Sequence, residues 1–168
     1  MNRDYALEAL NEPQFRLKIG LATQFILKIR RHARETYDFT PTEFEVFLTV
    51  VSATIDKIMR DPRLRSLYGD HQPVPVEELR FVSARAVCAA SGMNRETVRR
   101  AVNALVEKGW LTRGARGYAI SPAALMKPEN ARYFMAAFES IRQLTARWSR
   151  LEEDPGPAQP QTWREPVG

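Results

Sequence analysis

Residues 80–121 read RFVSARAVCAASGMNRETVRRAVNALVEKGWLTRGARGYAIS, and the pattern of this stretch decides the fold. Ser83 is suited to cap the helix-forming run that follows it, because its hydroxyl can accept a hydrogen bond from an amide of the first turn. Gly92 allows the left-handed turn that ends this helix, and Asn94 can cap a second one. The spacing predicts two helices that cross steeply, the second over about residues 95–108.

The residues after the second helix predict a small β-hairpin. The hairpin, residues 110–120, consists of two short β-prone runs separated by a turn that Gly114 and Gly117 bracket. A further β-prone piece, residues 80–82, precedes the first helix. This order of elements predicts a winged helix-turn-helix in which the hairpin is the wing.

The inward positions of the two helices are apolar, as a small core requires. The expected core residues are Val87, Met93, Val98, Val102 and Leu105. Cys88 falls where the helices come closest and where a small side chain fits, so we expect it to be a packing residue. As the only cysteine of the chain, it cannot form an intrachain disulfide.

The residues of this stretch also resemble a known family. The run from Val87 to Leu105, followed by Glu107–Leu111, is similar to the winged-helix signature of GntR-type bacterial regulators. Cys88 stands where that signature has another small residue, and Asn94 stands where it usually has serine. The resemblance implies a DNA-binding regulator of transcription.

The elements around this stretch resemble a different family of bacterial regulators. Two helices before it and a long helix after it are similar to the order in MarR regulators, whose dimers form through N- and C-terminal helices. GntR regulators carry a large effector domain, and the roughly 47 residues after Ser121 are too few to form one. We therefore expect a MarR-like homodimer built around a GntR-type helix-turn-helix.

The positive charge of the chain is concentrated in the same stretch. The sequence has 25 Lys and Arg against 20 Asp and Glu, a net charge of +5. Residues 80–118 alone contain eight basic and two acidic side chains, so the rest of the chain is close to neutral. A stretch that collects the whole excess is suited to a polyanion, and double-stranded DNA is the expected partner.

A recognition helix meets base edges with its N-terminal residues, which in this chain are rich in charged groups. Arginine can bond guanine through two atoms, glutamate can accept from cytosine, and threonine can contact a thymine methyl group. The expected base contacts are Arg95, Glu96, Thr97 and Arg99, with Glu96 alternatively a salt-bridge partner of Arg100. The expected contacts of the first helix, the second helix and the wing to phosphate or the minor groove are Ser83, Arg85, Arg100, Arg113 and Arg116.

Regular apolar spacing predicts three further helices. One begins near Pro13, a second follows the capping box Thr40–Glu43 and runs to about Arg60, and a third runs from Pro128 to about Leu151. The apolar stripe of the third helix must pack against the first helix, against a second subunit, or against both, and a homodimer is expected. The residues expected at this dimer interface are Phe15, Ile19, Ile26, Phe134, Ile141, Leu144 and Trp148.

Proline and glycine mark the expected divisions of the chain. Three prolines and Gly69 lie between Pro62 and Pro75, which is typical of a loop, and four prolines with little apolar content follow Asp154. The expected divisions are N-terminal scaffold and dimerisation helices over 1–61, a loop or linker over 62–79, the winged helix-turn-helix over 80–121, a C-terminal dimerisation helix over 122–153 and a disordered tail over 154–168.

An enzyme is not expected. The two histidines, His32 and His71, have no metal-binding spacing, and no phosphate-binding glycine loop or nucleophile motif occurs. No catalytic residue, metal ligand or cofactor is assigned, and no polar cluster identifies a small-molecule effector. No apolar run is long enough for a membrane span, and the first residues lack the pattern of a secretion signal, so a cytoplasmic, nucleoid-associated location is expected.

Two alternative functions also suit a winged helix. One is a module that binds protein within a larger complex, and the other is a replication initiator of the plasmid or phage type. A basic second helix favours DNA over the protein-binding module, which has no need of it.

Overall fold

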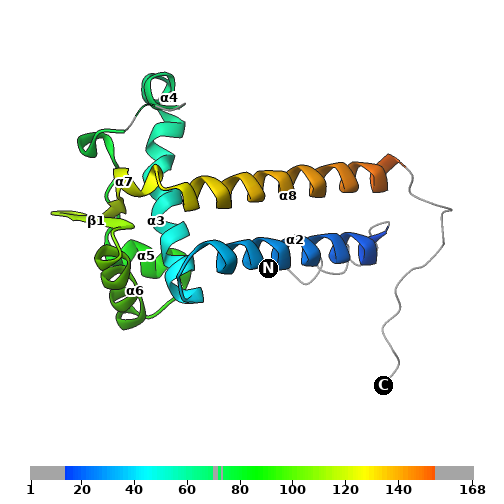
Figure 1. Ribbon diagram of the computed structural model, residues 1–168, viewed down its shortest axis with the longest axis horizontal. Helices are drawn as coiled ribbons and strands as arrows, with labels where there is room; N and C mark the ends of the chain where they lie inside the picture. The colour runs from blue at the N-terminus through cyan, green and yellow to red at the C-terminus, as the bar shows by residue number, and fades with distance from the viewer. Residues whose placement is uncertain (1–13, 70–71, 73, 154–168) are drawn as a thin grey trace. The chain divides into compact units, whose positions relative to one another are not determined.

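In the computed structural model, which describes residues 14–69, 72 and 74–153, the chain is mainly helical with one small antiparallel sheet (Figure 1). The predicted fold class is confirmed at that level. The contacts divide the chain into two units. Residues 36–133 form the central unit, and residues 14–35 together with 134–153 form the helix-pair unit.

The elements follow one another in the order that the sequence predicted, with additions between residues 62 and 79 and a short helix over residues 122–125. In chain order they are α2 Phe15–Thr36, α3 Pro41–Arg60, α4 Pro62–Tyr68, the 3₁₀ turn η1 Val76–Glu78, α5 Ala84–Ser91, α6 Arg95–Glu107, β1 Leu111–Gly114, β2 Gly117–Ile120, α7 Pro122–Leu125 and α8 Pro128–Glu153. The predicted start at Pro13 and the predicted tail over 154–168 lie outside the described residues.

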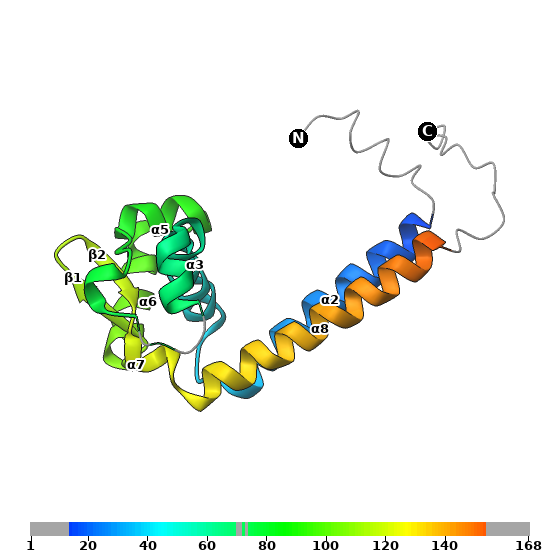
Figure 2. The ribbon, with the colours of Figure 1, turned by 90° about the horizontal axis from the view of Figure 1, so that it is seen from above.

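Helix α3 begins with the predicted capping box. The Thr40 hydroxyl accepts from the Glu43 amide at 3.2 Å, and the Glu43 carboxylate accepts from the Thr40 amide at 2.8 Å. Its buried face contacts α5, α6 and β2, and Figure 2 shows it beside the two helices. This corrects the expected division over 1–61: α3 belongs to the central unit and α2 to the helix-pair unit, because α3 supplies the core on which α5, α6 and the sheet pack.

Helices α5 and α6 are capped as predicted. Ser83 accepts from the Ala86 amide at 3.2 Å, and Asn94 accepts from the Thr97 amide at 2.9 Å. Gly92 ends α5 with a φ of 69°, in the left-handed region. Four of the five predicted core residues are fully buried, whereas Met93 and Cys88 are only half-buried.

Strands β1 and β2 form the predicted hairpin, with Leu111 paired to Ile120 and Gly114 to Gly117. The β-prone piece before α5 adds one bridge, between Val82 and Tyr118. Gly117 has a φ of 135°, and a Cβ atom there would lie 2.1 Å from the Val82 carbonyl oxygen. Glycine is therefore required where the turn passes over the bridge.

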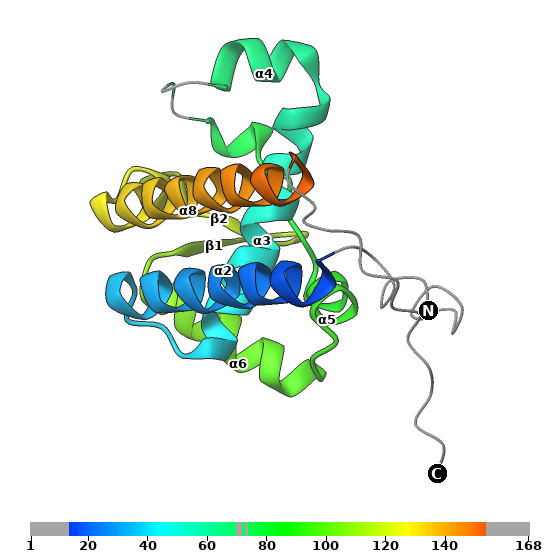
Figure 3. The same ribbon diagram turned by 90° about the vertical axis from the view of Figure 1, so that its right-hand side faces the viewer.

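The loop expected over residues 62–79 is wrong in part, because helix α4 and the turn η1 lie within it. Asp61 caps α4 by accepting from the Arg63 and Leu64 amides, and Pro62 occupies the first helical position. Figure 3 shows α4 as a separate helix that follows α3. Leu64 is buried in a cluster with Ile58, Val74, Leu79 and Ala119. The cap and this buried leucine outweigh the proline and glycine content that indicated a loop.

The central unit has an aromatic core whose packing the sequence did not predict. Six rings from α3, α8 and the segments before α3 and β1 pack within 6 Å of at least one neighbour, and they are Tyr37, Phe39, Phe44, Phe47, Trp110 and Tyr133. The Tyr37 hydroxyl donates to Asn130 at 2.8 Å, and burial raises the pKa of this tyrosine well above its usual value. The cluster fixes α3 against the start of the hairpin.

The helix-pair unit consists of α2 and α8, which lie side by side and run antiparallel (Figures 1 and 2). Lys28 donates to Gln143 at 2.8 Å and Arg147 donates to Gln24 at 2.9 Å. The earlier of the two α2 residues thus meets the later of the two α8 residues, as antiparallel helices require. Leu21, Ala137 and Ser140 are buried between them.

Candidate nucleic-acid interface

Helix α6 has one buried and one exposed face. Val98, Val102 and Leu105 are fully buried, and this fixes the rotation of the helix in the central unit. The four exposed charged residues at its start are Arg95, Glu96, Arg99 and Arg100. Thr97, the remaining predicted base contact, is half-buried. All the predicted base contacts therefore lie on the first turn and a half of one helix, and three of the four are exposed.

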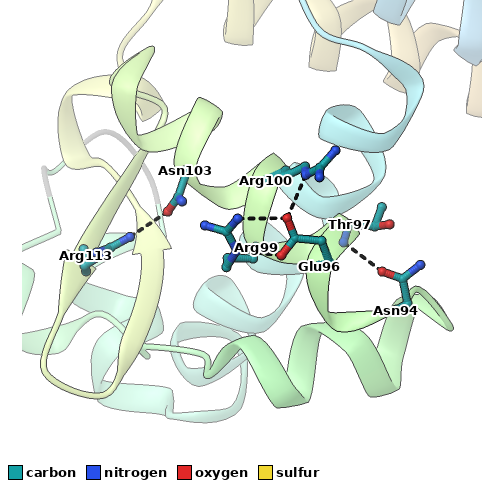
Figure 4. A network of polar contacts seen from close by, with 7 residues as sticks. All are labelled: Asn94, Glu96, Thr97, Arg99, Arg100, Asn103 and Arg113. Carbon is teal, nitrogen blue, oxygen red and sulfur yellow. Dashed lines mark hydrogen bonds and ion pairs between the residues drawn. The ribbon is translucent and has the colours of Figure 1, made fainter.

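The carboxylate of Glu96 is shared by two arginines. It accepts from Arg99 Nε at 2.7 Å and from Arg99 Nη2 at 2.8 Å, and it also accepts from Arg100 Nε at 2.7 Å (Figure 4). The hydrogen bonds from Arg99 and then Arg100 lower the pKa of Glu96 to about 2, so the carboxylate is ionised at neutral pH. The structure bears out the pairing with Arg100 as one of the two roles expected for Glu96, and it adds Arg99 to the same site.

Arg113 on the hairpin is held against α6. Its guanidinium donates to the Asn103 side-chain oxygen at 2.7 Å (Figure 4). It also lies 5.4 Å from the centre of the Tyr118 ring. Sequence reasoning missed Asn103, although it follows Arg99 by four residues and so lies on the same face of the helix. The two residues link the hairpin to the exposed face of α6.

Three other predicted contacts are exposed arginines: Arg85 on α5, Arg95 on α6 and Arg116 between the strands. Within the described part of the chain, none of the three has an ion pair or a side-chain hydrogen bond. Ser83 caps α5 through its oxygen, which leaves its hydroxyl hydrogen available as a donor. These groups belong to the same unit as Glu96 and the two arginines that share its carboxylate.

Two of the eight basic residues in the charge count are scaffold residues. Arg80 pairs with Asp56 on α3 at 3.1 Å. Lys108 pairs with Glu43 at 3.1 Å and donates to the Asp38 carbonyl at 2.6 Å. Fewer basic residues are therefore available to a ligand than the sequence count suggests, and these lie on α5, α6 and the hairpin.

The residues predicted for a dimer interface divide into two groups. Ile19, Ile26 and Ile141 are 48%, 55% and 47% exposed. The other four are half-buried in the helix-pair unit: Phe15, Phe134, Leu144 and Trp148. Further exposed apolar residues of the same unit are Leu17, Leu27, Met135 and Phe138. The antiparallel pairing of α2 and α8 thus covers one stripe of each helix and leaves a second apolar surface uncovered.

One apolar cavity of about 490 Å³ lies within the central unit, between α3, α4 and α7. Ile55, Ile58 and Leu125 line it, and Arg65 and Gln72 are its charged and amide groups. None of the residues predicted for the interface lines this cavity.

The described residues contain no group of three or more His, Cys, Asp and Glu side chains that could hold a metal ion. None of their helices combines the length and the apolar character needed to cross a bilayer. No family model matches the chain, and no curated protein or solved structure matches it significantly.

Proposed function

We propose that the central unit is a winged helix-turn-helix that binds double-stranded DNA and that the protein is a sequence-specific regulator of transcription. In this proposal α6 is the recognition helix and the β1–β2 hairpin is the wing. The observation that carries it is that the exposed charged face of α6, Arg85 and the hairpin arginines belong to one folded unit. If these arginines were only solvated surface charges, there would be no reason for them to be concentrated on these three elements.

The start of α6 suits the major groove. Its N-terminal residues would meet the base edges, with Arg95 and Arg99 bonding guanine through O6 and N7. Thr97, which is half-buried, would reach a thymine methyl group or a phosphate. The buried face of α6 holds these side chains in register, because Val98 and Val102 have no freedom to rotate out of the core.

The remaining groups suit the sugar–phosphate backbone. Ser83 and Arg85 stand at the start of α5, where the positive end of the helix dipole also favours phosphate. Arg100 lies on the exposed face of α6, and the hairpin supplies Arg113 and Arg116. Contacts of this kind position a protein on the duplex without reading its sequence.

We further propose that the protein acts as a homodimer, with the GntR-type signature in the helix-turn-helix and a MarR-like use of the outer helices. The support is the exposed apolar surface of α2 and α8, which includes Ile19, Ile26 and Ile141. Large exposed apolar patches are uncommon on monomers, and a second copy would cover this one symmetrically.

Selection of bound fragments from random double-stranded DNA tests both proposals. A dimeric winged helix should enrich two inverted half-sites whose centres are about 10 base pairs, or a multiple of that, apart. A single half-site, together with a monomer in sedimentation analysis, would contradict the dimer. No enrichment of any sequence would contradict sequence-specific binding and favour the protein-binding module.

A further inference from the structure

Two arginines that the proposed recognition helix would use to bind DNA are already paired with Glu96. Arg99 and Arg100 are the basic groups of its second turn, and both are bound to the same carboxylate. Arg99 is 59% exposed and Arg100 77% exposed, so both can leave without disturbing the core. A DNA phosphate must therefore compete with Glu96 for them, and the carboxylate itself repels the phosphate.

We propose that Glu96 is a specificity-determining residue, which holds Arg99 and Arg100 back from the phosphates of arbitrary duplexes and releases them where a cytosine amino group replaces them as donor to its carboxylate. This inference rests on the proposed function. On a site without such a donor, freeing the arginines leaves the carboxylate unpaired beside the phosphates. On a site with the donor, the carboxylate keeps a hydrogen bond while both arginines contact DNA.

The base is assigned from the donors and acceptors in the major groove. Cytosine presents its N4 amino group there, and glutamate is suited to accept from it. Adenine presents its N6 amino group beside the N7 acceptor, which faces a carboxylate unfavourably. Guanine and thymine present acceptors, which a carboxylate cannot bond. Cytosine is therefore the base that satisfies Glu96.

A purely structural role for Glu96 makes a different prediction. An acidic residue in the first turn of a helix is favoured by the helix dipole, and pairs three and four residues apart stabilise helices slightly. Such a role would change the melting temperature of the protein when Glu96 is replaced. It would leave the ratio of specific to non-specific DNA affinity unchanged.

The test compares Glu96→Gln with Glu107→Gln, on the full-length protein and two duplexes. Both replacements make the same change in net charge. Glu107 is exposed at the end of the same helix and has no ion pair within the described residues, so its replacement frees no arginine. Glu96→Gln should tighten binding to a duplex of arbitrary sequence. It should also steepen the plot of log affinity against log salt by about 1.8 to 3.6, because one or two arginines are freed in each subunit of the proposed dimer. Glu107→Gln should change neither by a comparable amount.

On the selected site, Glu96→Gln should reduce the ratio of specific to non-specific affinity at least about fivefold. A second selection with Glu96→Ala should lose one cytosine from each half-site of the enriched sequence. Equal behaviour of the two glutamine variants, or retention of every cytosine by Glu96→Ala, would overturn the inference while leaving the proposed function standing. Absence of duplex binding by the wild-type protein would instead overturn the proposed function.

Discussion

Replacing Phe47 with alanine should lower the free energy of unfolding of the central unit by about 3 to 5 kcal/mol. Phe47 is fully buried on α3, and its ring lies 5.4 Å from that of Phe39 and 5.6 Å from that of Trp110, measured between ring centres. Its removal leaves a cavity that the surrounding rings cannot fill by small shifts. The loss should affect the whole unit, because these rings join α3 to the start of the hairpin.

Chemical denaturation followed by circular dichroism measures this effect. Met59→Ala is the control, since Met59 lies near the end of the same helix and is 66% exposed. The control should change the free energy of unfolding by less than about 0.5 kcal/mol. If the two variants were equally stable, the aromatic cluster would not be the core of the unit.

Replacing Arg95 with alanine should weaken binding to the selected DNA site by about 1 to 3 kcal/mol and relax the base preference at one position. Arg95 stands at the first position of α6, exposed and outside the Glu96 pairing, so it can meet a base edge without breaking an internal contact. Arg116→Ala, at the tip of the hairpin, should weaken binding by a similar factor on every sequence, because a phosphate contact carries no sequence information.

A gel-shift titration of both variants on the selected site and on a scrambled duplex separates the two roles. Arg95→Ala should bring the two duplexes closer in affinity, and Arg116→Ala should leave their ratio unchanged. Wild-type affinity in both variants would show that the assigned residues do not contact DNA. An equal loss on both duplexes for Arg95→Ala would move it to the backbone contacts.

The sequence was sufficient for the parts of the fold that local chemistry decides. Ser83, Asn94 and the Thr40–Glu43 pair are caps whose partners lie within three residues, and the structure has each of them where it was predicted. The turn at Gly92 and the hairpin glycines are local features of the same kind. Such signals can be read from a single sequence because each depends only on its immediate neighbours.

Features that depend on distant residues were missed. Tyr37 and Trp110 meet edge to face in the core, although more than seventy positions separate them in the chain. Leu64 stabilises α4 only because Val74 and Ala119 surround it, and these neighbours are not visible in the local pattern. The same limit explains why α3 was grouped with the first helix over residues 1–61, although its buried face packs in the central unit.

In the candidate interface, the positions of the charged residues could be predicted from the sequence, but their interaction partners could not. The charged positions of α6 could be predicted from helical spacing, and they lie on one exposed face. The sequence count also included Arg80 and Lys108, which ion pairs with α3 residues hold within the scaffold. The link between Arg113 and Asn103 depends on how the hairpin packs on α6, which spacing alone does not provide.

The salt dependence of binding to double-stranded DNA tests the central claim most directly. The basic residues assigned to phosphate in each subunit are Arg85, Arg100, Arg113 and Arg116. On its selected site, where Arg100 is released from Glu96, a dimer would then make about eight such contacts, and its affinity for that site should fall about 10³- to 10⁵-fold between 50 and 200 mM salt. An affinity that does not change with salt, or no binding at the lower concentration, would contradict DNA as the partner of this protein.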